Sequence, residues 1–128
     1  MATDGDTAGL RGIKVLIAED EAVVAFDLEF TLGDFGCTVL PPVASAAEAL
    51  ALMARERPDV ALLDVSLNDG PSTPVARELV AAGVPYAVTS GYDTEQITET
   101  LLRDVPQLGK PYQANELRDT LLRLVGRA

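Results

Sequence analysis

Five polar side chains follow short apolar segments of the chain and could together carry out metal or phosphate chemistry. They are Glu19, Asp20, Asp64, Ser90 and Lys110. Carboxylates without histidine or thiolate partners favour a hard cation such as Mg²⁺. A carboxylate can also act as a nucleophile and accept a phosphoryl group as an acyl phosphate. The pattern predicts that Asp64 is the nucleophile, with Mg²⁺, the Lys110 ammonium and the Ser90 hydroxyl neutralising and positioning the phosphoryl group.

The composition limits which other groups could take part in this chemistry. The 128 residues include no histidine, so the chain has no imidazole to act as metal ligand, general base or phosphoacceptor. Cys37 is the single cysteine, which excludes a disulfide within the chain. The reactive groups must therefore be carboxylates, hydroxyls, the amine of Lys110 and the backbone.

The overall charge argues against two classes of partner. Twenty acidic and ten basic residues give a net charge of −10. Nucleic acids and anionic lipids bind basic patches, so we expect neither as a direct partner. No apolar run approaches the ~20 residues of a membrane span. The first ten residues also lack the basic and apolar regions of a signal peptide. We therefore expect a cytoplasmic protein.

Alternating strand and helix patterns must position the polar side chains. Short aliphatic runs predict buried strands, and longer amphipathic or Ala/Leu-rich segments between them predict helices. The expected strands cover residues 13–18, 37–43, 60–63, 85–89 and 105–109. The expected helices cover residues 22–32, 46–57, 72–82, 94–103 and 114–125. This alternation predicts an α/β fold of the (βα)5 type, a doubly wound parallel sheet with helices on both faces.

Two segments carry specific expectations about burial. The helix expected over residues 22–32 is predicted to be strongly buried because of its many apolar residues, which are Val23, Val24, Phe26, Leu28, Phe30 and Leu32. Residues 1–11 are small, polar and charged, and we expect a flexible N-terminal tail there. Residues 12–128 are then expected to form one domain.

In an open α/β sheet, ligands bind beyond the carboxyl ends of the strands. The polar residues stand at the ends of the expected first, third, fourth and fifth strands: Glu19 and Asp20, Asp64, Ser90, and Lys110. Each of them alone has an ordinary explanation as a helix cap or a loop residue. Because four strand ends carry such groups, we expect them to converge on one site at this edge of the sheet.

Four segments of the chain resemble the signature segments of response-regulator receiver domains. They are VLIAEDE at 15–21, VALLD at 60–64, VPYAVTSGY at 84–92 and GKPY at 109–112. The resemblance runs from about residue 12 to residue 125 and implies the flavodoxin-like strand order 2-1-3-4-5. The pattern is similar to that of single-domain regulators paired with sensor kinases in alphaproteobacteria. This implies a stand-alone regulator of a two-component system.

The resemblance implies a role for each residue of the metal site. Glu19 and Asp20 would hold Mg²⁺, Glu19 through a water molecule. Asp64 would be both a metal ligand and the phosphoacceptor. The backbone carbonyl of Ser66 would complete the ligands that the protein supplies.

The resemblance also implies which groups would bind the phosphoryl group. Ser90 would donate a hydrogen bond to it. We choose Ser90 over Thr89 because the family's hydroxyl residue precedes a small residue, here Gly91. Lys110 would bind a phosphoryl oxygen, and the peptide bond that follows it, before Pro111, would be cis.

Three positions depart from the family pattern. The loop after Asp64 reads VSLNDG and lacks the proline that many receivers have there. Gln107 stands where a switching aromatic residue is common, so the usual coupling of hydroxyl to aromatic cannot operate at that position. Tyr92 either replaces this aromatic residue or gates access to Asp64.

The resemblance implies partners that are proteins. A sensor histidine kinase or a phosphotransfer protein would donate the phosphoryl group. Phosphorylation would shift a pre-existing equilibrium between two conformations. The face formed by the expected fourth helix (94–103), fifth strand (105–109) and fifth helix (114–125) would present the change to a downstream protein. The chain would act as a relay intermediate, a phosphate sink or a regulator, as a monomer or weak dimer. It would be no conventional enzyme, catalysing only its own phosphorylation and slow autodephosphorylation.

Two other classes of α/β protein share parts of this pattern. Phosphohydrolases with an aspartyl nucleophile place a second Asp two residues after the nucleophile behind the first strand, and residues 19–21 (EDE) offer no such pair. Flavin-binding electron carriers need a Ser/Thr/Gly-rich phosphate loop there, where this chain has three acids. The receiver interpretation is therefore favoured over both.

Overall fold

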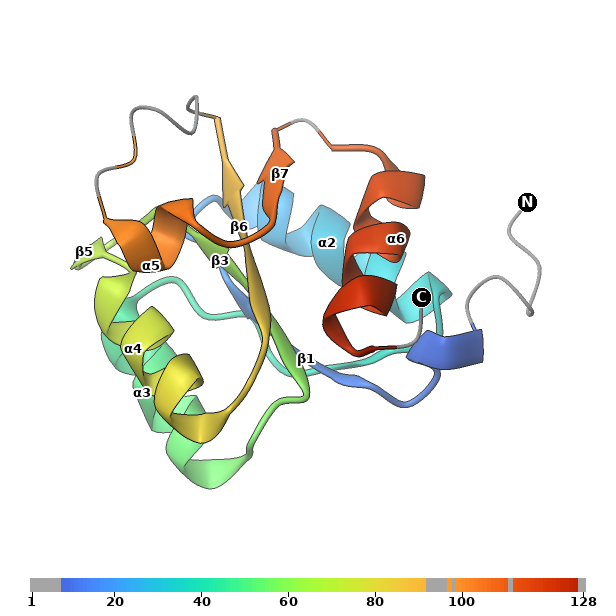
Figure 1. Ribbon diagram of the computed structural model, residues 1–128, viewed down its shortest axis with the longest axis horizontal. Helices are drawn as coiled ribbons and strands as arrows, with labels where there is room; N and C mark the ends of the chain where they lie inside the picture. The colour runs from blue at the N-terminus through green and yellow to red at the C-terminus, as the bar shows by residue number, and fades with distance from the viewer. Residues whose placement is uncertain (1–7, 92–96, 98, 111, 127–128) are drawn as a thin grey trace.

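Five parallel strands form the central sheet of the protein, whose computed structural model describes residues 8–91, 97, 99–110 and 112–126. The strands are β1 (Lys14–Ala18), β2 (Thr38–Val39), β3 (Val60–Asp64), β6 (Tyr86–Ser90) and β7 (Gln107–Gly109). Their order across the sheet is β2-β1-β3-β6-β7, and every neighbouring pair is parallel (Figure 1). These are the five strands expected from the sequence, in chain order. The structure therefore confirms the α/β fold with flavodoxin-like order 2-1-3-4-5.

Helices cover both faces of this sheet (Figure 1). On one face lie α2 (Ala22–Asp34) and α6 (Ala114–Leu124), and on the other lie α3 (Ala46–Arg55), α4 (Thr73–Ala82) and α5 (Thr100–Arg103). Successive strand residues point to opposite faces, so each strand contributes to both cores. Leu16 and Leu63 pack on the α3–α4–α5 side, whereas Ile17 and Leu62 pack on the α2–α6 side. This double burial explains why the strands are almost uninterrupted apolar runs.

Two expected elements are shorter than the sequence predicts. The second strand was expected over residues 37–43 but pairs as a strand only at Thr38–Val39. Pro41 and Pro42 have no N–H group to donate, and the chain returns to the sheet only at Val43, which bridges Ala18. In the expected helix 94–103, α5 (Thr100–Arg103) is helical, and residues 94–96 and 98 lie outside the described residues.

A small hairpin lies within the segment after β3 that the sequence indicates as a loop. It consists of β4 (Ser66–Leu67) and the antiparallel β5 (Gly70–Pro71), with Asn68 and Asp69 between them. Gly70 has a φ of 125°, a left-handed backbone conformation that glycine adopts without steric cost. The hairpin projects from the carboxyl end of β3 and forms a separate two-stranded sheet (Figure 1).

The expectation that α2 is strongly buried is wrong for one of its faces. Val23, Phe26 and Phe30 are 81%, 69% and 70% exposed. The buried residues of this helix are Ala25, Leu28 and Leu32. At 100° per residue the two sets lie on opposite sides of the helix, so only one can face the sheet. The exposed set, Val23, Phe26 and Phe30, is called the apolar stripe of α2 below.

The flexible tail expected over residues 1–11 extends too far along the chain. Residues Ala8–Leu10 form a short 3-10 helix, and the Leu10 side chain is fully buried in the α2–α6 core. The next turn is fixed as well, because the Gly12 N–H donates to the Gly36 carbonyl at 2.8 Å. Leu10 is one apolar residue among polar neighbours, so local composition did not reveal that it completes the core.

Candidate active site

The strand register brings the predicted polar residues to one edge of the sheet. Glu19 directly follows β1, and Asp64 is the last residue of β3, where it pairs with Thr89 of β6. Ser90 is the last residue of β6 and pairs with Gly109, so Lys110 comes directly after the end of β7. The predicted convergence of these strand ends is thus confirmed.

Three carboxylates form a compact cluster at this edge. One carboxylate oxygen from each of Glu19, Asp20 and Asp64 lies within 4.8 Å of the others. Glu19 is buried, with 3% of its surface exposed, and the Lys110 ammonium contacts its Oε1 atom. A buried carboxylate that faces two further carboxylates fits a hard divalent cation such as Mg²⁺. The cluster could therefore hold the metal that the sequence predicts.

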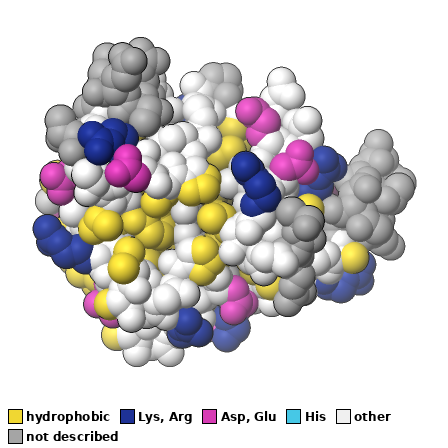
Figure 2. All heavy atoms as spheres, in the orientation of Figure 1, with side chains coloured by type: hydrophobic (Ala, Val, Ile, Leu, Met, Phe, Trp, Pro, Cys, Tyr) yellow, Lys and Arg dark blue, Asp and Glu magenta, His cyan; other side chains and the backbone are white. Residues whose placement is uncertain are grey.

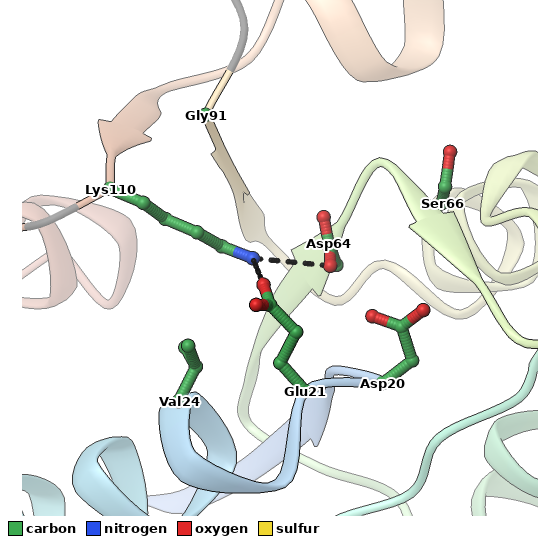
Figure 3. Close-up of a pocket in the computed structure, with 7 residues that line it drawn as sticks. All are labelled: Asp20, Glu21, Val24, Asp64, Ser66, Gly91 and Lys110. Atoms are coloured by element: carbon green, nitrogen blue, oxygen red, sulfur yellow. Dashed lines mark hydrogen bonds and ion pairs between the residues drawn. The ribbon is translucent and has the colours of Figure 1, made fainter.

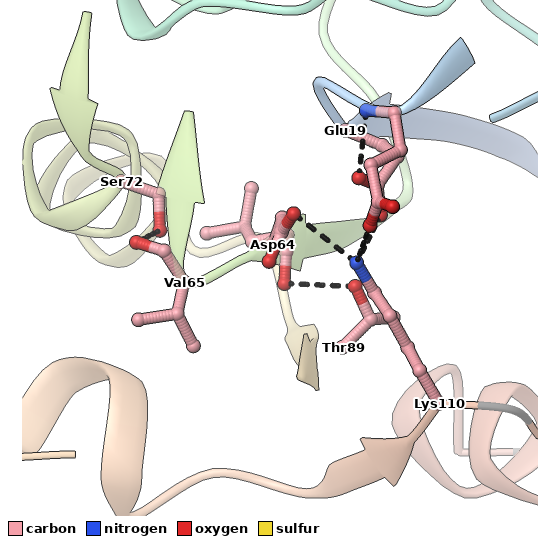
Figure 4. A network of polar contacts seen from close by, with 8 residues as sticks. Glu19, Asp64, Val65, Ser72, Thr89 and Lys110 are labelled. Carbon is pink, nitrogen blue, oxygen red and sulfur yellow. Dashed lines mark hydrogen bonds and ion pairs between the residues drawn. The ribbon is translucent and has the colours of Figure 1, made fainter. Parts of the chain in front are cut away.

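Lys110 supplies the positive charge of the cluster. Its Nζ atom lies 2.8 Å from Oε1 of Glu19, 3.2 Å from Oδ2 of Asp64 and 3.2 Å from Oε1 of Glu21 (Figure 4 shows Glu19 and Asp64). Burial opposes a charge on this amine, but the carboxylates outweigh it and raise the pKa of Lys110. Lys110 is therefore a fixed cation that reaches Asp64 directly.

The surroundings of Asp64 disfavour its ionised form. Burial, followed by the adjacent Glu19 carboxylate, raises the pKa of Asp64 to about 7, although Lys110 pulls it downward. The single positive charge of Lys110 thus offsets only part of the negative charge of the neighbouring carboxylates. A further cation would stabilise the charged carboxylate that a nucleophile requires.

The site opens into a cavity of about 720 Å³ (Figure 3). The residues that line it are Asp20, Glu21, Val24, Asp64, Ser66, Gly91 and Lys110. Figure 3 shows the Lys110 side chain extending from one wall toward Asp64 and Glu21, with Asp20 and Ser66 on the far side of Asp64. Asp64 lines this cavity and is thus accessible to a reactant.

The two predicted serines differ in their position relative to this cavity. Ser66, the first residue of β4, lines it, as does Gly91. Ser90 is buried, with 4% of its surface exposed, and its carbonyl accepts the Lys110 N–H at 3.0 Å. The neighbouring Thr89 hydroxyl donates to the Leu63 carbonyl at 3.5 Å, so it is directed at the backbone of β3 (Figure 4). The choice of Ser90 as the phosphoryl-binding hydroxyl stays a prediction.

Gln107 has a structural contact that the sequence did not predict. Its Nε2 atom donates to the carbonyls of Leu102 at 2.7 Å, Val105 at 3.0 Å and Arg103 at 3.3 Å. The amide thus satisfies backbone carbonyls at the C-terminal end of α5, where a helix leaves such groups without partners. Tyr92 and the expected cis bond to Pro111 lie outside the described residues.

Glu21 is the site residue that sequence reasoning left without a role. It lines the cavity and forms an ion pair with Lys110, 89 positions further along the chain. The run EDE was a visible signal, but only folding shows that its first and third acids contact the lysine.

Comparison with known proteins assigns the class of protein that this fold and site define. The family model described as response regulator receiver domain matches residues 15–122. The chain therefore belongs to the response regulator receiver family. Receiver domains of this family generally bind Mg²⁺ and are response regulators of two-component systems rather than conventional enzymes.

Several relatives are similar over most of this chain. The solution structure of SdrG from Sphingomonas melonis Fr1 is 34% identical with a TM-score of 0.77, covering 91% of this chain and 98% of SdrG. The receiver domain of Erythrobacter litoralis PhyR is 26% identical with a TM-score of 0.80, covering 91% of this chain and 92% of that domain.

A curated relative is longer than this chain. The transcriptional regulatory protein PdtaR from Mycobacterium tuberculosis is 29% identical over 119 residues, which are 90% of this chain. The match covers only 57% of PdtaR. In the part of the chain that the structure describes, no helix is both long and apolar enough to cross a membrane.

Proposed function

We propose that this protein is a response regulator that accepts a phosphoryl group on Asp64 from a histidine of a sensor kinase or a phosphotransfer protein. The observation that carries the proposal is the position of the Asp64 carboxylate, between an acidic cluster and the Lys110 ammonium at an open cavity. The residues that would hold Mg²⁺ are Glu19 through water, Asp20, Asp64 and the Ser66 carbonyl. When bound, the metal would neutralise charge on the carboxylates and the incoming phosphoryl oxygens.

The transfer step exchanges one bond to phosphorus for another. An Asp64 carboxylate oxygen attacks the phosphorus atom, and an O–P bond forms as the N–P bond of the donor's phosphohistidine breaks. The electron pair of that bond stays on the imidazole nitrogen, and the product on this chain is an acyl phosphate. The Lys110 ammonium lies 3.2 Å from Asp64 and would form an ion pair with a phosphoryl oxygen. The Ser90 hydroxyl would then hydrogen-bond the phosphoryl group.

The phosphohistidine of the donor lies outside this sequence, which contains no histidine. We propose that the donor contacts the start of the apolar stripe of α2. Val23 and Phe26 are exposed, and with Lys110 and Tyr112 they line a smaller cavity of about 240 Å³. Val24 of the same helix lines the main cavity. Exposed apolar surface beside a reactive group is typical of a protein interaction site.

The output of the site would also be a protein interaction. Phosphorylation would shift an existing equilibrium, and the face formed by α5, β7 and α6 would present the change to a downstream protein. On the side of the molecule that carries these elements, hydrophobic side chains gather between α4 and α6 (Figure 2). Gln107 of β7 donates hydrogen bonds to backbone carbonyls at the end of α5. Hydrogen bonds, and no aromatic side chain at position 107, thus connect β7 to α5. The proposal further includes a cytoplasmic location, a monomer or weak dimer, and slow autodephosphorylation.

Phosphorylation of Asp64 can be tested with small donors. With Mg²⁺ and acetyl phosphate, intact-mass spectrometry should show one added phosphoryl group on the wild type and none on Asp64→Asn. Asp59→Asn is the matched control, because the Asp59 carboxylate accepts the Lys14 N–H at the opposite end of β1, far from the site. Beryllofluoride should bind under the same conditions. A wild type that neither binds beryllofluoride nor gains a phosphoryl group contradicts the proposal.

A further inference from the structure

The hairpin that follows Asp64 is fastened at its base by a serine. The Ser72 N–H and the Ser72 hydroxyl both donate to the Val65 carbonyl, at 2.9 Å and 3.2 Å (Figure 4). These bonds close the loop that begins directly after Asp64 and contains Ser66. Ser72 is fully buried, so the base is shielded from water. The base alone leaves the far end of the hairpin free to move.

The tip of the hairpin is fastened to α3 by Asp69. Its Oδ1 atom accepts the Ala46 N–H at 2.8 Å, and its Oδ2 atom accepts the Ala47 N–H at 3.1 Å. One backbone bond supports this contact, from the Asn68 N–H to the Ala44 carbonyl at 3.0 Å. Both oxygens of the carboxylate are thus engaged, although its side chain is exposed. Such a bidentate contact orients the tip as well as attaching it.

Asp69 is not needed to start α3, because Ser45 caps that helix. The Ser45 hydroxyl accepts the Glu48 N–H at 3.1 Å, and Glu48 in turn accepts the Ala44 N–H at 3.2 Å. The N–H groups of Ala46 and Ala47 remain, and these are the two that Asp69 takes. A carboxylate at a helix N-terminus is also attracted by the helix dipole. The Asp69 contact therefore serves chiefly to hold the hairpin.

The same segment that receives Asp69 also holds the acidic loop after β1. The Glu19 N–H donates to the Val43 carbonyl at 2.9 Å, and the Val43 N–H donates to the Ile17 carbonyl at 3.0 Å. Residues 43–47 are thus bonded to Glu19 on one side and to the hairpin on the other. They connect the two loops that would supply the metal ligands.

We propose that Asp69 is a positioning residue that fixes the Ser66 backbone relative to Glu19 and Asp64. Ser66 lies three residues from Asp69 in a hairpin of two short strands, so release of the tip moves the Ser66 carbonyl. Loss of this contact would weaken cation binding and phosphorylation without removing any ligand. Partners of ligands typically change metal affinity about 10-fold or more when they are removed. This inference rests on the proposed function of the site.

The test compares Asp69→Ala with Asp59→Ala. Asp59 is an equally exposed aspartate that accepts one backbone N–H, from Lys14, at 2.8 Å and far from the site. Calorimetric titration with Mg²⁺ should show affinity weakened about 10-fold in Asp69→Ala and unchanged in Asp59→Ala. Acetyl phosphate should phosphorylate Asp69→Ala correspondingly more slowly. Asp69→Asn keeps one acceptor oxygen and should restore part of the affinity.

Two results separate this inference from the proposed function. If wild-type protein binds Mg²⁺ and beryllofluoride but Asp69→Ala binds Mg²⁺ as tightly as Asp59→Ala does, the positioning role is overturned and the proposed function stands. If the wild type binds neither probe, the proposed function fails first. Should Asp69→Ala not fold, as judged by circular dichroism, equal Mg²⁺ affinity in Asp69→Asn and wild type overturns the role.

Discussion

At the scale of single residues, the site holds more negative charge than its one lysine can balance. Glu19, Glu21 and Asp64 all lie within 3.2 Å of Lys110 Nζ, and Asp20 adds a further carboxylate to the cluster. The fold therefore keeps Asp64 poised between a protonated and a charged form. A cation shifts it to the charged form, in which it can act as a nucleophile.

The first prediction concerns pH and stability without Mg²⁺. The pKa of Asp64 is about 7 in the folded protein, above the value of about 3.9 for an unfolded chain. The folded state thus binds the extra proton, and this contribution to stability is full below pH ~4 and lost as pH rises through ~7. Asp64→Asn removes the titration. In EDTA at pH 8, its Tm should exceed that of the wild type by at least about 4 °C.

The control for this prediction is the same pair of proteins at low pH. At pH 4 both carry a neutral side chain at position 64, so the Tm difference should shrink toward zero. Differential scanning calorimetry across this pH range measures it. A difference that is constant with pH would show that titration of Asp64 is not its cause.

The second prediction concerns Lys110→Ala. Without this amine Asp64 loses its direct cation, and the phosphoryl oxygen has no ammonium to bind. Acetyl phosphate with Mg²⁺ should still phosphorylate the variant, but the conformational shift should be lost. Amide NMR spectra with and without beryllofluoride measure that shift. Spectral changes as large as those of the wild type would contradict the role of Lys110.

At the scale of elements, α2 has two apolar sides with different tasks. Leu28 faces the sheet with 1% of its surface exposed, whereas Phe26 is 69% exposed. Burial of the first side stabilises the fold. The second side contributes little to stability, and its position beside the cavity suits it to contact a donor protein.

The third prediction separates these two tasks. Leu28→Ala leaves a cavity in the core and should lower the free energy of unfolding by about 2–5 kcal/mol. Phe26→Ala should lower it by less than about 1 kcal/mol, because the ring is already in water. Urea denaturation monitored by circular dichroism measures both changes. Equal losses in the two variants would show that Phe26 belongs to the core.

The same Phe26→Ala variant tests the docking role of the apolar stripe. Phosphotransfer from the cognate histidine kinase should slow by about 10-fold or more, which is the loss of a contact worth about 1.4 kcal/mol. Phosphorylation by acetyl phosphate should keep the wild-type rate, since that donor needs no protein surface. Glu29→Ala, an exposed substitution on the same helix, serves as the control. If Phe26→Ala receives the phosphoryl group from the kinase as fast as the wild type does, the proposed docking surface is contradicted.

At the scale of the whole molecule, the site exists because parallel strands end at one edge of the sheet. Residues as far apart in the chain as Glu19 and Lys110 meet there, 2.8 Å apart. Binding of a cation at this edge would therefore connect the loops after β1, β3 and β7, and its effect should reach the stability of the entire domain.

The fourth prediction measures that effect. A ligand present at 100 times its dissociation constant stabilises the folded state by about 2.7 kcal/mol. Mg²⁺ at such a concentration should therefore raise the Tm of the wild type by several degrees, and EDTA should reverse the change. Asp20→Asn, which removes one carboxylate of the cluster, should show a smaller rise at equal Mg²⁺. An identical rise in both proteins would place the cation elsewhere.

The alternation of elements, the class of fold and most of the site follow from local features of the amino-acid sequence. Strand and helix periods are local properties, and Glu19, Asp20, Asp64, Ser90 and Lys110 each stand next to a recognisable strand. Since parallel strands end at the same edge, their convergence followed from the order of the elements.

Only the tertiary structure decided contacts that depend on distance along the chain. Both sides of α2 are apolar, so its local pattern could not say which one faces the sheet. Leu10 is buried by helices that come later in the chain. The local sequence indicates only that Asp69 lies in a loop. Folding places it against the N–H groups of Ala46 and Ala47, which come 23 and 22 positions earlier. In each case the partner group is remote in sequence, and packing of the whole domain selects it.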